Sequence, residues 1–425
     1  MILPLTSSEE ENSRREIYLS KAAKVGFIDN MAVRSILLTV LVAALATFLY
    51  GRSHVLKSFV ANAPDRLQKI NTLENYEIKF ADRMRNCEDV VLVKERHLAI
   101  TACDPGRDKW NVVMGVRIPG ELPQTELFAY NYATSGAGAG ALTPFKMIGF
   151  PGVGDFRALG LEIDEPSSTL FVASHAQAGP RIEVFHLDLD DFTATHAATL
   201  THPLLNQPNS IQLLGGRHEL YVSNDHYFTA RKTPVLAKIE TLLGLPFASV
   251  VHVSLDPADY AVQSARVVAR LPFANGVALL NDTTLAVASS SGGAVHLYRV
   301  EADRSLTRKR TKITVPFLPD NLSLKDGKTL LITGHPHLPS LTAIAKSRHV
   351  CNDAEMLATA SDEEKEACAK AIGLSWVVEW SEEQGLRNVF VESIYGSSTT
   401  TVWDGEAGFG LMTGLYEKGL FTWRV

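Results

Sequence analysis

A short strand–turn–strand unit recurs along this chain, and the repeat limits the folds that the chain can adopt. One copy, RLPFANGVALLNDTTLAVASSSG, runs from Arg270 to Gly292 and sets an asparagine–glycine pair before two strand-like runs joined by a polar turn. Looser copies begin at Glu88, Gly160, Asn209, Asn321 and Thr400. A small antiparallel unit cannot bury both of its faces alone, so the copies must stack against one another.

The repeat predicts an all-β protein, folded as a six-bladed β-propeller over residues 73–425. Strand-like runs between the units, such as RIEVFHLDL and SVVHVSLDP, supply the outer strands of the blades. No long linker rich in proline, glycine and serine divides this range. A β-sandwich or a two-domain β protein is the alternative that the strand pattern leaves open.

An uncharged and mostly apolar run at 35–51 predicts an N-terminal hydrophobic anchor helix, at the lower length limit for crossing a bilayer. Basic residues are more frequent before this run than after it, which predicts a cytoplasmic N-terminus. We therefore expect a cytoplasmic leader (1–34), a transmembrane signal-anchor (35–51), a juxtamembrane segment (52–72) and a lumenal or extracellular propeller. A cleaved signal peptide and a buried core helix are the alternatives.

The cysteines fit an oxidising compartment. Cys351 and Cys368 bracket an acidic, helix-like insert, and we favour a disulfide between them; Cys87 and Cys103 flank a predicted hairpin. Asn281 begins an acceptor sequon for N-glycosylation in a predicted turn. A formal net charge of -6 with scattered basic residues gives no reason to expect nucleic acid as a partner.

The residues at the heads of the repeats suggest a metal site. In a propeller the innermost strand of each blade lines the central channel, so residues at equivalent positions converge on the axis. Two carboxylates and three amides occupy these positions: Glu88, Asn209, Asn275, Asp320 and Asn321. Their oxygens suit Ca²⁺, whereas burying them without a cation costs several kcal/mol. The alternative for each residue taken singly is a turn-forming role.

Six stretches carry a resemblance to a known family: CEDVVLV, PNSIQLL, SNDHYF, PFANGV, PDNLSL and GHPH. From about Ser53 to Val425 the chain resembles the paraoxonase/arylesterase family, calcium-dependent six-bladed propeller lactonases and esterases. The resemblance implies that one catalytic calcium is held by the five head residues named above. It also implies a second, structural calcium at Asp89 and the backbone carbonyl of Leu161, but Ser210 stands where the family has an aspartate.

The resemblance also implies catalytic side chains. His226, His335 and Asp225 match family residues near the channel, and His175 matches the second histidine of a proposed dyad. Leu159 stands in the place of the first histidine, and leucine can neither accept nor relay a proton. The candidate catalytic residues are therefore His335, His226, Asp320 and His175. A hydrogen-bonding role at a strand end is the alternative for each histidine.

The expected function is hydrolysis of small lipophilic lactones or aryl esters, with Ca²⁺ polarising the carbonyl. No G-x-S-x-G elbow, phosphate-binding loop or H-E-x-x-H helix points to another reaction class. Segments 55–70 and 233–251 combine apolar and basic residues and could contact a membrane, or they could belong to the ordinary core. A calcium-stabilised propeller that serves as a non-catalytic binding scaffold is the alternative function.

Overall fold

The computed structural model describes residues 7–133 and 141–425 of the chain, which divides into two compact units, Met1–His54 and Val55–Val425. Helix α1 spans Ser7–Ala61 and contains a stretch, Ala32–Ser58, that is long and apolar enough to cross a membrane. The predicted span at 35–51 lies within this stretch. The division into leader, span and juxtamembrane segment stays a prediction, and residues 1–6 of the leader lie outside the described residues.

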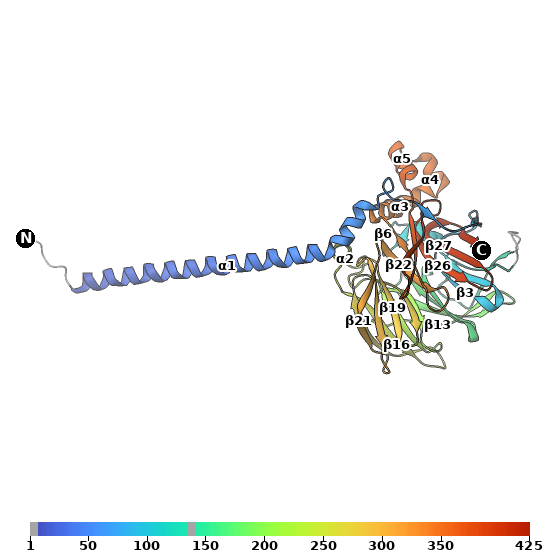
Figure 1. Ribbon diagram of the computed structural model, residues 1–425, viewed down its shortest axis with the longest axis horizontal. Helices are drawn as coiled ribbons and strands as arrows, with labels where there is room; N and C mark the ends of the chain where they lie inside the picture. The colour runs from blue at the N-terminus through green and yellow to red at the C-terminus, as the bar shows by residue number, and fades with distance from the viewer. Residues whose placement is uncertain (1–6, 134–140) are drawn as a thin grey trace, which may run out of the picture. The chain divides into compact units, whose positions relative to one another are not determined.

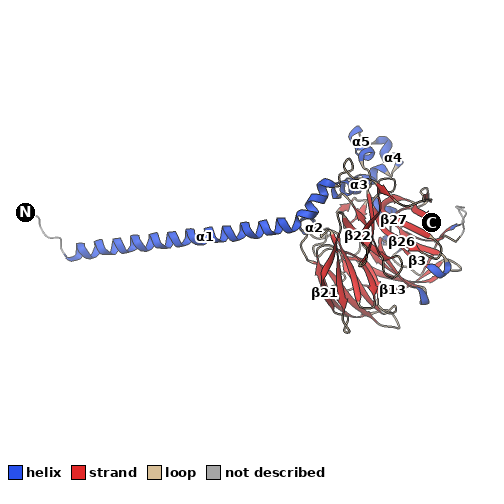
Figure 2. Ribbon diagram, viewed as in Figure 1, coloured by secondary structure: helices blue, strands red, loops and turns tan. Residues whose placement is uncertain are grey.

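The second unit is built from β-sheets in which groups of four antiparallel strands, which we call blades, can be distinguished (Figures 1 and 2). Blade 1 holds β3 (Arg85–Val93), β4 (Leu98–Cys103), β7 (Glu126–Asn131) and β8 (Leu142–Pro144). Blade 2 holds β10 (Ala158–Asp164), β11 (Thr169–Ser174), β12 (Arg181–Asp188) and β13 (Thr193–Leu200). Blade 3 holds β14 (Pro208–Leu213), β15 (Glu219–Asn224), β16 (Ala248–Leu255) and β17 (Val262–Leu271).

The remaining blades follow the same order along the chain. Blade 4 holds β18 (Ala274–Asn281), β19 (Thr284–Ser289), β20 (Ala294–Val300) and β21 (Leu306–Thr314). Blade 5 holds β22 (Leu318–Leu324), β23 (Leu330–His335), β24 (Ser375–Ser381) and β25 (Gly385–Glu392). Blade 6 holds β26 (Ser398–Asp404), β27 (Phe409–Lys418), β28 (Leu420–Arg424) and β2 (Glu77–Lys79).

Short strands, helices and 3₁₀ turns lie outside the four main strands of the blades. The strands are β1 (Ile70–Asn71) on β25, β9 (Lys146–Ile148) on β13, and the hairpin β5 (Trp110–Asn111) with β6 (Val116–Arg117). The helices are α2 (Pro234–Leu243), α3 (Leu338–Cys351), α4 (Ala354–Thr359) and α5 (Asp362–Lys370), and the 3₁₀ turns are η1 (Lys94–Arg96), η2 (Pro105–Asp108), η4 (Val153–Asp155) and η5 (Glu165–Ser167). Helices α3, α4 and α5 lie together at one side of the blades (Figure 2).

The blades close into a ring, which confirms the predicted all-β propeller. Each innermost strand contacts the innermost strand of the next blade, and the cycle returns from β26 to β3. β2 completes blade 6 although it precedes blade 1 in the sequence, and β27 also pairs with β3, so the two ends of the propeller are joined. A hydrophobic cluster fills each interface between neighbouring blades. These six interfaces hold the core.

The innermost strands share one irregularity that positions the site. In every blade the pairing of the first two strands shifts register close to the start of the innermost strand. The shift spans Cys87 to Val90 in β3, Pro208 to Ile211 in β14 and Ala274 to Val277 in β18. A β-bulge of this kind re-aims side chains locally. The head residues therefore lie in bulges within strands, and the alternative of a turn-forming role is wrong.

In two of these bulges, at Leu159–Gly160 and Asn275–Gly276, the second residue is glycine because the neighbouring blade is close. A Cβ atom on Gly276 would lie 2.6 Å from the Asn321 Cα and 2.7 Å from the Asp320 carbonyl oxygen. A Cβ atom on Gly160 would lie 2.3 Å from the Asn209 carbonyl oxygen. Both are closer than side chains pack against backbone. The asparagine–glycine pair at 275–276 thus serves close packing around the axis.

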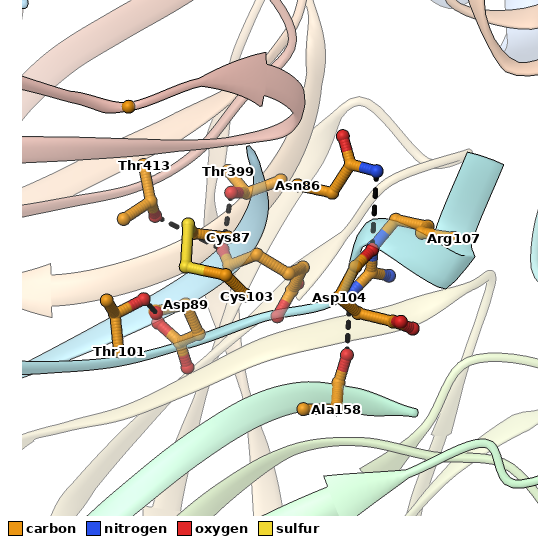
Figure 3. Close-up of a disulfide and its surroundings, with 12 residues drawn as sticks. Asn86, Cys87, Asp89, Thr101, Cys103, Asp104, Arg107, Ala158, Thr399 and Thr413 are labelled. Carbon is orange, nitrogen blue, oxygen red and sulfur yellow. Dashed lines mark hydrogen bonds between the residues drawn. A yellow bond between two sulfur atoms is a disulfide. The ribbon is translucent and has the colours of Figure 1, made fainter. Parts of the chain in front are cut away.

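All four cysteines form disulfides, and the favoured pair Cys351–Cys368 is confirmed. This bond joins α3 to α5 within the acidic insert. The second bond, Cys87–Cys103, links β3 to β4 at directly paired positions, beside Asp89 and Thr101 (Figure 3). It therefore fastens the beginning of the first innermost strand next to the bulge that carries Glu88 and Asp89.

Candidate metal centre

The first bulge residue of most blades lines a small enclosed cavity on the propeller axis. This set, which we call the cavity ring, comprises Glu88, Leu159, Asn209, Asn275 and Asp320. The cavity encloses about 50 Å³. His335, Thr241 and Phe273 also line it, and apolar side chains cover it: Val113, Met114, Leu338, Leu341 and Leu415. Four of the five proposed calcium ligands, each from a different blade, thus line one cavity, and their role as ligands stays a prediction.

The fifth proposed ligand, Asn321, lies directly beside the cavity ring. Its Nδ2 donates to Glu88 Oε1 at 3.1 Å and to the Thr400 hydroxyl at 2.9 Å. Asn321 follows Asp320 in the bulge of β22 and is itself buried. The five proposed ligands therefore form one contiguous group.

Four side-chain oxygens of this group are buried without a hydrogen-bond partner among residues 7–133 and 141–425: Glu88 Oε2, Asn209 Oδ1, Asn275 Oδ1 and Asn321 Oδ1. The amide nitrogens are used, since Asn275 Nδ2 donates to Ser290 Oγ at 3.0 Å and Asn209 Nδ2 faces Asp225 Oδ2 at 3.5 Å. Each amide is therefore held by its nitrogen while its carbonyl oxygen stays free. Burying such oxygens unpaired costs several kcal/mol in sum, which a cation would offset.

The charges of the five proposed ligands also favour a bound cation. Burial, followed by the neighbouring charges of Asp89 and Asp320, raises the pKa of Glu88 well above its usual range. Asp320 is buried as well, and its Oδ2 is 2.8 Å from His335 Nε2. Two carboxylates and three amide carbonyls form an all-oxygen donor set, which fits the preference of Ca²⁺. The described residues contain no group of three His, Cys, Asp or Glu side chains suited to a metal, in keeping with a site rich in amides.

A second set of residues, at the bulges or directly after them, forms the funnel ring and lines a separate 420 Å³ hollow along the axis. It comprises Asp89, Ser210, Asn321 and Thr400. Asp89 is satisfied by the protein: Oδ1 accepts from the Val90 N–H and the Thr400 hydroxyl, and Oδ2 accepts from the Leu161 N–H, at 2.7–2.8 Å. Three protein donors thus occupy the Asp89 carboxylate, and Ser210 adds no charge. These residues therefore fit a second calcium ion less well than the cavity ring fits the first. The second, structural calcium stays a prediction.

Two of the candidate histidines border the cavity ring. His335 hydrogen-bonds Asp320 through Nε2, and its Nδ1 is buried without a partner in the described ranges. His226 lies between Asp225 and Thr241: Nδ1 is 2.6 Å from Asp225 Oδ1, and Nε2 is 2.6 Å from Thr241 Oγ1. Phe273 packs against the His226 ring, with centroids 4.5 Å apart.

His175 has a different environment. Its Nε2 lies 2.9 Å from the Pro208 carbonyl oxygen and its Nδ1 lies 3.4 Å from Gln207 Nε2, outside the residues that line the cavity. Burial lowers the pKa of His175 to about 4, so the ring is neutral at physiological pH. Leu159, which the resemblance sets in the place of the dyad partner, forms part of the cavity wall. A catalytic role for His175 therefore stays a prediction.

Comparison with known proteins identifies the family. The Arylesterase family model matches residues 154–367, which is half of the chain. The chain belongs to the arylesterase family. The matched range contains four of the five proposed ligands, together with His226, Thr241 and His335. The candidate centre therefore lies mostly within the part of the chain that the family model matches.

The curated relatives resemble part of the chain. Serum paraoxonase/arylesterase 1 of Rattus norvegicus is 33% identical over 165 residues, covering 38% of this chain and 43% of that protein. Serum paraoxonase/lactonase 3 of Oryctolagus cuniculus is 30% identical over 171 residues, covering 40% and 45%. The chain thus aligns with less than half the length of the curated relatives it matches.

Among solved structures, a gluconolactonase from Xanthomonas campestris aligns with 84% of this chain and 94% of its own at 13% identity, with a TM-score of 0.48. A luciferin-regenerating enzyme aligns with 82% of this chain and 94% of its own at 11% identity, with a TM-score of 0.47.

Sequence reasoning missed two kinds of residue around the cavity. Ser290 and Thr400 hold the amide nitrogens of Asn275 and Asn321, but serine and threonine at strand ends are too common to single out. Thr241 reaches the cavity from α2, a segment that the sequence presented only as apolar and basic. Its position depends on how α2 packs against blade 3, which no local pattern encodes.

Proposed function

We propose that the chain is a calcium-dependent hydrolase of lactones or aryl esters. The observation that carries the proposal is a set of four buried side-chain oxygens without a partner among the described residues: Glu88 Oε2, Asn209 Oδ1 and Asn275 Oδ1 at the cavity that Asp320 and His335 also line, and Asn321 Oδ1 directly beside it. Glu88, Asn209, Asn275, Asp320 and Asn321 would hold the ion. When bound, Ca²⁺ supplies a Lewis acid that polarises the substrate carbonyl. Membership of the arylesterase family supports the ester or lactone class of substrate.

The protein residues of the cavity have separate tasks in this proposal. Asp320 fixes the His335 ring through Nε2. The apolar side chains of α3 and β27 exclude water from the reaction and favour lipophilic substrates. Because about 50 Å³ holds only a few water molecules, an ester must displace part of this cover to enter. His226 and Asp225 form a second, buried histidine–carboxylate pair behind Thr241, which lines the cavity.

A membrane is the proposed partner of the whole chain. The stretch Ala32–Ser58 would act as a signal-anchor, with the disulfide-bonded propeller in the lumen or outside the cell. Helix α2, which contributes Thr241 to the cavity, exposes Val235 at 68%, Leu242 at 56% and Ile239 at 42%. This apolar face would let lipophilic substrates reach the site from a bilayer. The last four residues of segment 233–251 are instead buried in β16, where they belong to the core.

Glycosylation at Asn281 is part of the same proposal. Asn281 ends β18 on the surface, and its Oδ1 accepts hydrogen bonds from the N–H and hydroxyl of Thr283. The sequon therefore lies in an exposed turn, as a lumenal acceptor site requires.

The test uses the full chain purified in detergent. We expect turnover of phenyl acetate and δ-valerolactone with Ca²⁺, loss of turnover after EDTA, and recovery when Ca²⁺ is restored. E88Q should be inactive, whereas E382Q, which changes an exposed acid in the turn between β24 and β25, should match the wild type. Turnover that is unchanged by exhaustive chelation would contradict the role of calcium.

The second candidate function is a calcium-stabilised scaffold without catalysis. Leu159 in the cavity ring and the apolar cover over the cavity favour it. A chain that binds Ca²⁺ and gains thermal stability from it, but turns over neither aryl esters nor lactones, would establish the scaffold and exclude the hydrolase.

A further inference from the structure

The wall of the cavity contains a hydroxyl group that is aligned with a buried histidine and a buried aspartate. Thr241, near the end of α2, places its Oγ1 2.6 Å from His226 Nε2, and His226 Nδ1 is 2.6 Å from Asp225 Oδ1. Asp225 is fully buried and His226 nearly so. This sequence of contacts, carboxylate to imidazole to hydroxyl, is the arrangement that activates a nucleophile in acyl transfer.

The hydrogen bonds determine the direction of the proton. An aspartate carboxylate only accepts hydrogen bonds, so the proton of neutral His226 belongs on Nδ1 and leaves Nε2 as an acceptor. The Thr241 hydroxyl then donates to Nε2. Its other contact, 3.1 Å to the Ala237 carbonyl oxygen one helical turn earlier, is longer and is the ordinary alternative for a threonine in a helix.

The second hydroxyl that lines the cavity cannot take this role. Ser290 Oγ donates to the Pro319 carbonyl oxygen at 2.6 Å and accepts from Asn275 Nδ2. Ser290 therefore orients the proposed ligand Asn275, and its own proton goes to a backbone carbonyl instead of a base. Thr241 is the cavity hydroxyl with a histidine in place to accept its proton.

We propose that Thr241 is the nucleophile of a covalent hydrolysis, with His226 as its general base and Asp225 as the residue that positions His226. Thr241 Oγ1 attacks the ester carbonyl carbon while its proton moves to His226 Nε2. The carbon–oxygen bond to the leaving group breaks, and the alkoxide takes that proton, which leaves an acyl ester on Thr241. Water then attacks the acyl carbon, His226 takes one proton and returns it to Thr241 Oγ1, and the carboxylic acid departs.

This inference rests on the proposed hydrolase function and supplies a base where Leu159 provides none. It makes the reaction double-displacement, whereas direct attack by water would leave no covalent intermediate. The two routes differ in one observable, the acyl group on the protein.

The test is a covalent trap on the full calcium-loaded chain. p-Nitrophenyl dimethylcarbamate carbamoylates nucleophilic hydroxyls and the product hydrolyses slowly, so we expect one added carbamoyl group per chain by intact mass, mapped to Thr241 by peptide sequencing. T241V, which keeps the shape and removes the hydroxyl, should form no adduct and lose about 100-fold or more of phenyl acetate kcat. T241S should recover both the adduct and part of the rate.

The control is T359V. Thr359 in α4 also donates a hydrogen bond to a carbonyl one turn earlier, that of Glu355, but it is not among the residues that line the cavity. It should match the wild type in both measurements. Absence of an adduct on an active wild type, or an adduct that persists in T241V, overturns the nucleophile while the hydrolase function stands. A loaded wild type that turns over no ester or lactone removes the hydrolase function itself.

Discussion

The carboxylates of Glu88 in the cavity ring and Asp89 in the funnel ring differ in what satisfies their oxygens. In the cavity ring, Glu88 Oε2 has no hydrogen-bond donor in the described part of the chain, and the same holds for the carbonyl oxygens of Asn209 and Asn275. In the funnel ring, Asp89 receives three hydrogen bonds from Val90, Leu161 and Thr400. Glu88 and Asp89 are adjacent in sequence and both are buried. Acidity and burial alone therefore do not separate Glu88, which we propose as a calcium ligand, from Asp89; the unpaired oxygen of Glu88 does.

The largest expected effect comes from breaking the cavity ring. E88Q removes one of its two charges while keeping the shape, so we expect loss of the bound ion and at least about a 1000-fold loss of aryl ester kcat, because several kcal/mol of carbonyl polarisation depend on the ion. Metal content by mass spectrometry and phenyl acetate kinetics check this. A variant with full metal content and full activity would remove Glu88 from the site.

A smaller effect should follow from loosening the support of that ring. S290A removes the hydroxyl that receives the Asn275 amide nitrogen at 3.0 Å. The amide can then rotate, and the loss of such a supporting contact lowers metal affinity by about 10–100-fold. Titration of the metal-free chain with Ca²⁺, followed by calorimetry, measures the change. An unchanged dissociation constant would mean that Asn275 needs no orientation or does not bind the ion.

Changing the funnel ring should affect stability rather than metal content. Asp89 accepts hydrogen bonds from three donors, and in D89N the new NH₂ group must face at least one of them. We therefore expect a loss of about 1–2 kcal/mol in unfolding free energy. Calcium stoichiometry should stay at one per chain. A fall from two ions to one would instead place a structural calcium at Asp89, as the family resemblance implies.

A partly buried carboxylate, Glu417, sharpens the comparison because it lines neither the cavity nor the funnel hollow. Burial raises the pKa of Glu417 to about 7, although Arg348 opposes the shift. The folded state thus holds a proton that the unfolded chain releases above its ordinary pKa, so this group's contribution to stability falls as pH rises from about 4.5 to about 7. E417Q should match the wild type near pH 5 and exceed its unfolding free energy by about 1 kcal/mol at pH 8. Thermal unfolding at both pH values decides; equal curves at pH 8 would show that Glu417 ionises freely.

The predicted ring of blades and the convergence of its head residues both follow from the repeat. The pattern of two strands and a turn fixes the blade, and the copies must pack because each blade has two apolar faces. Glu88, Asn209, Asn275 and Asp320 were recognisable because they occupy one position in different copies. Leu159 occupies that position in blade 2 as well, and only the resemblance drew attention to it.

Other parts of the site lay beyond the reach of the sequence. Two of the three hydrogen bonds to Asp89 come from the Leu161 N–H of β10 and the Thr400 hydroxyl of β26, which come close only when the ring closes. Thr241 is separated from His226 by fifteen residues, and its contact requires α2 to fold back over blade 3.

The sequence by itself determined the strand repeat, the apolar N-terminal stretch and the identity of the axial side chains, because these depend on residue order and spacing. Only the tertiary structure decided which oxygens stay unpaired, since a hydrogen bond between blades exists only at contact distance. It also decided that Asn275–Gly276 forms a bulge, where the neighbouring backbone leaves no room for a Cβ atom.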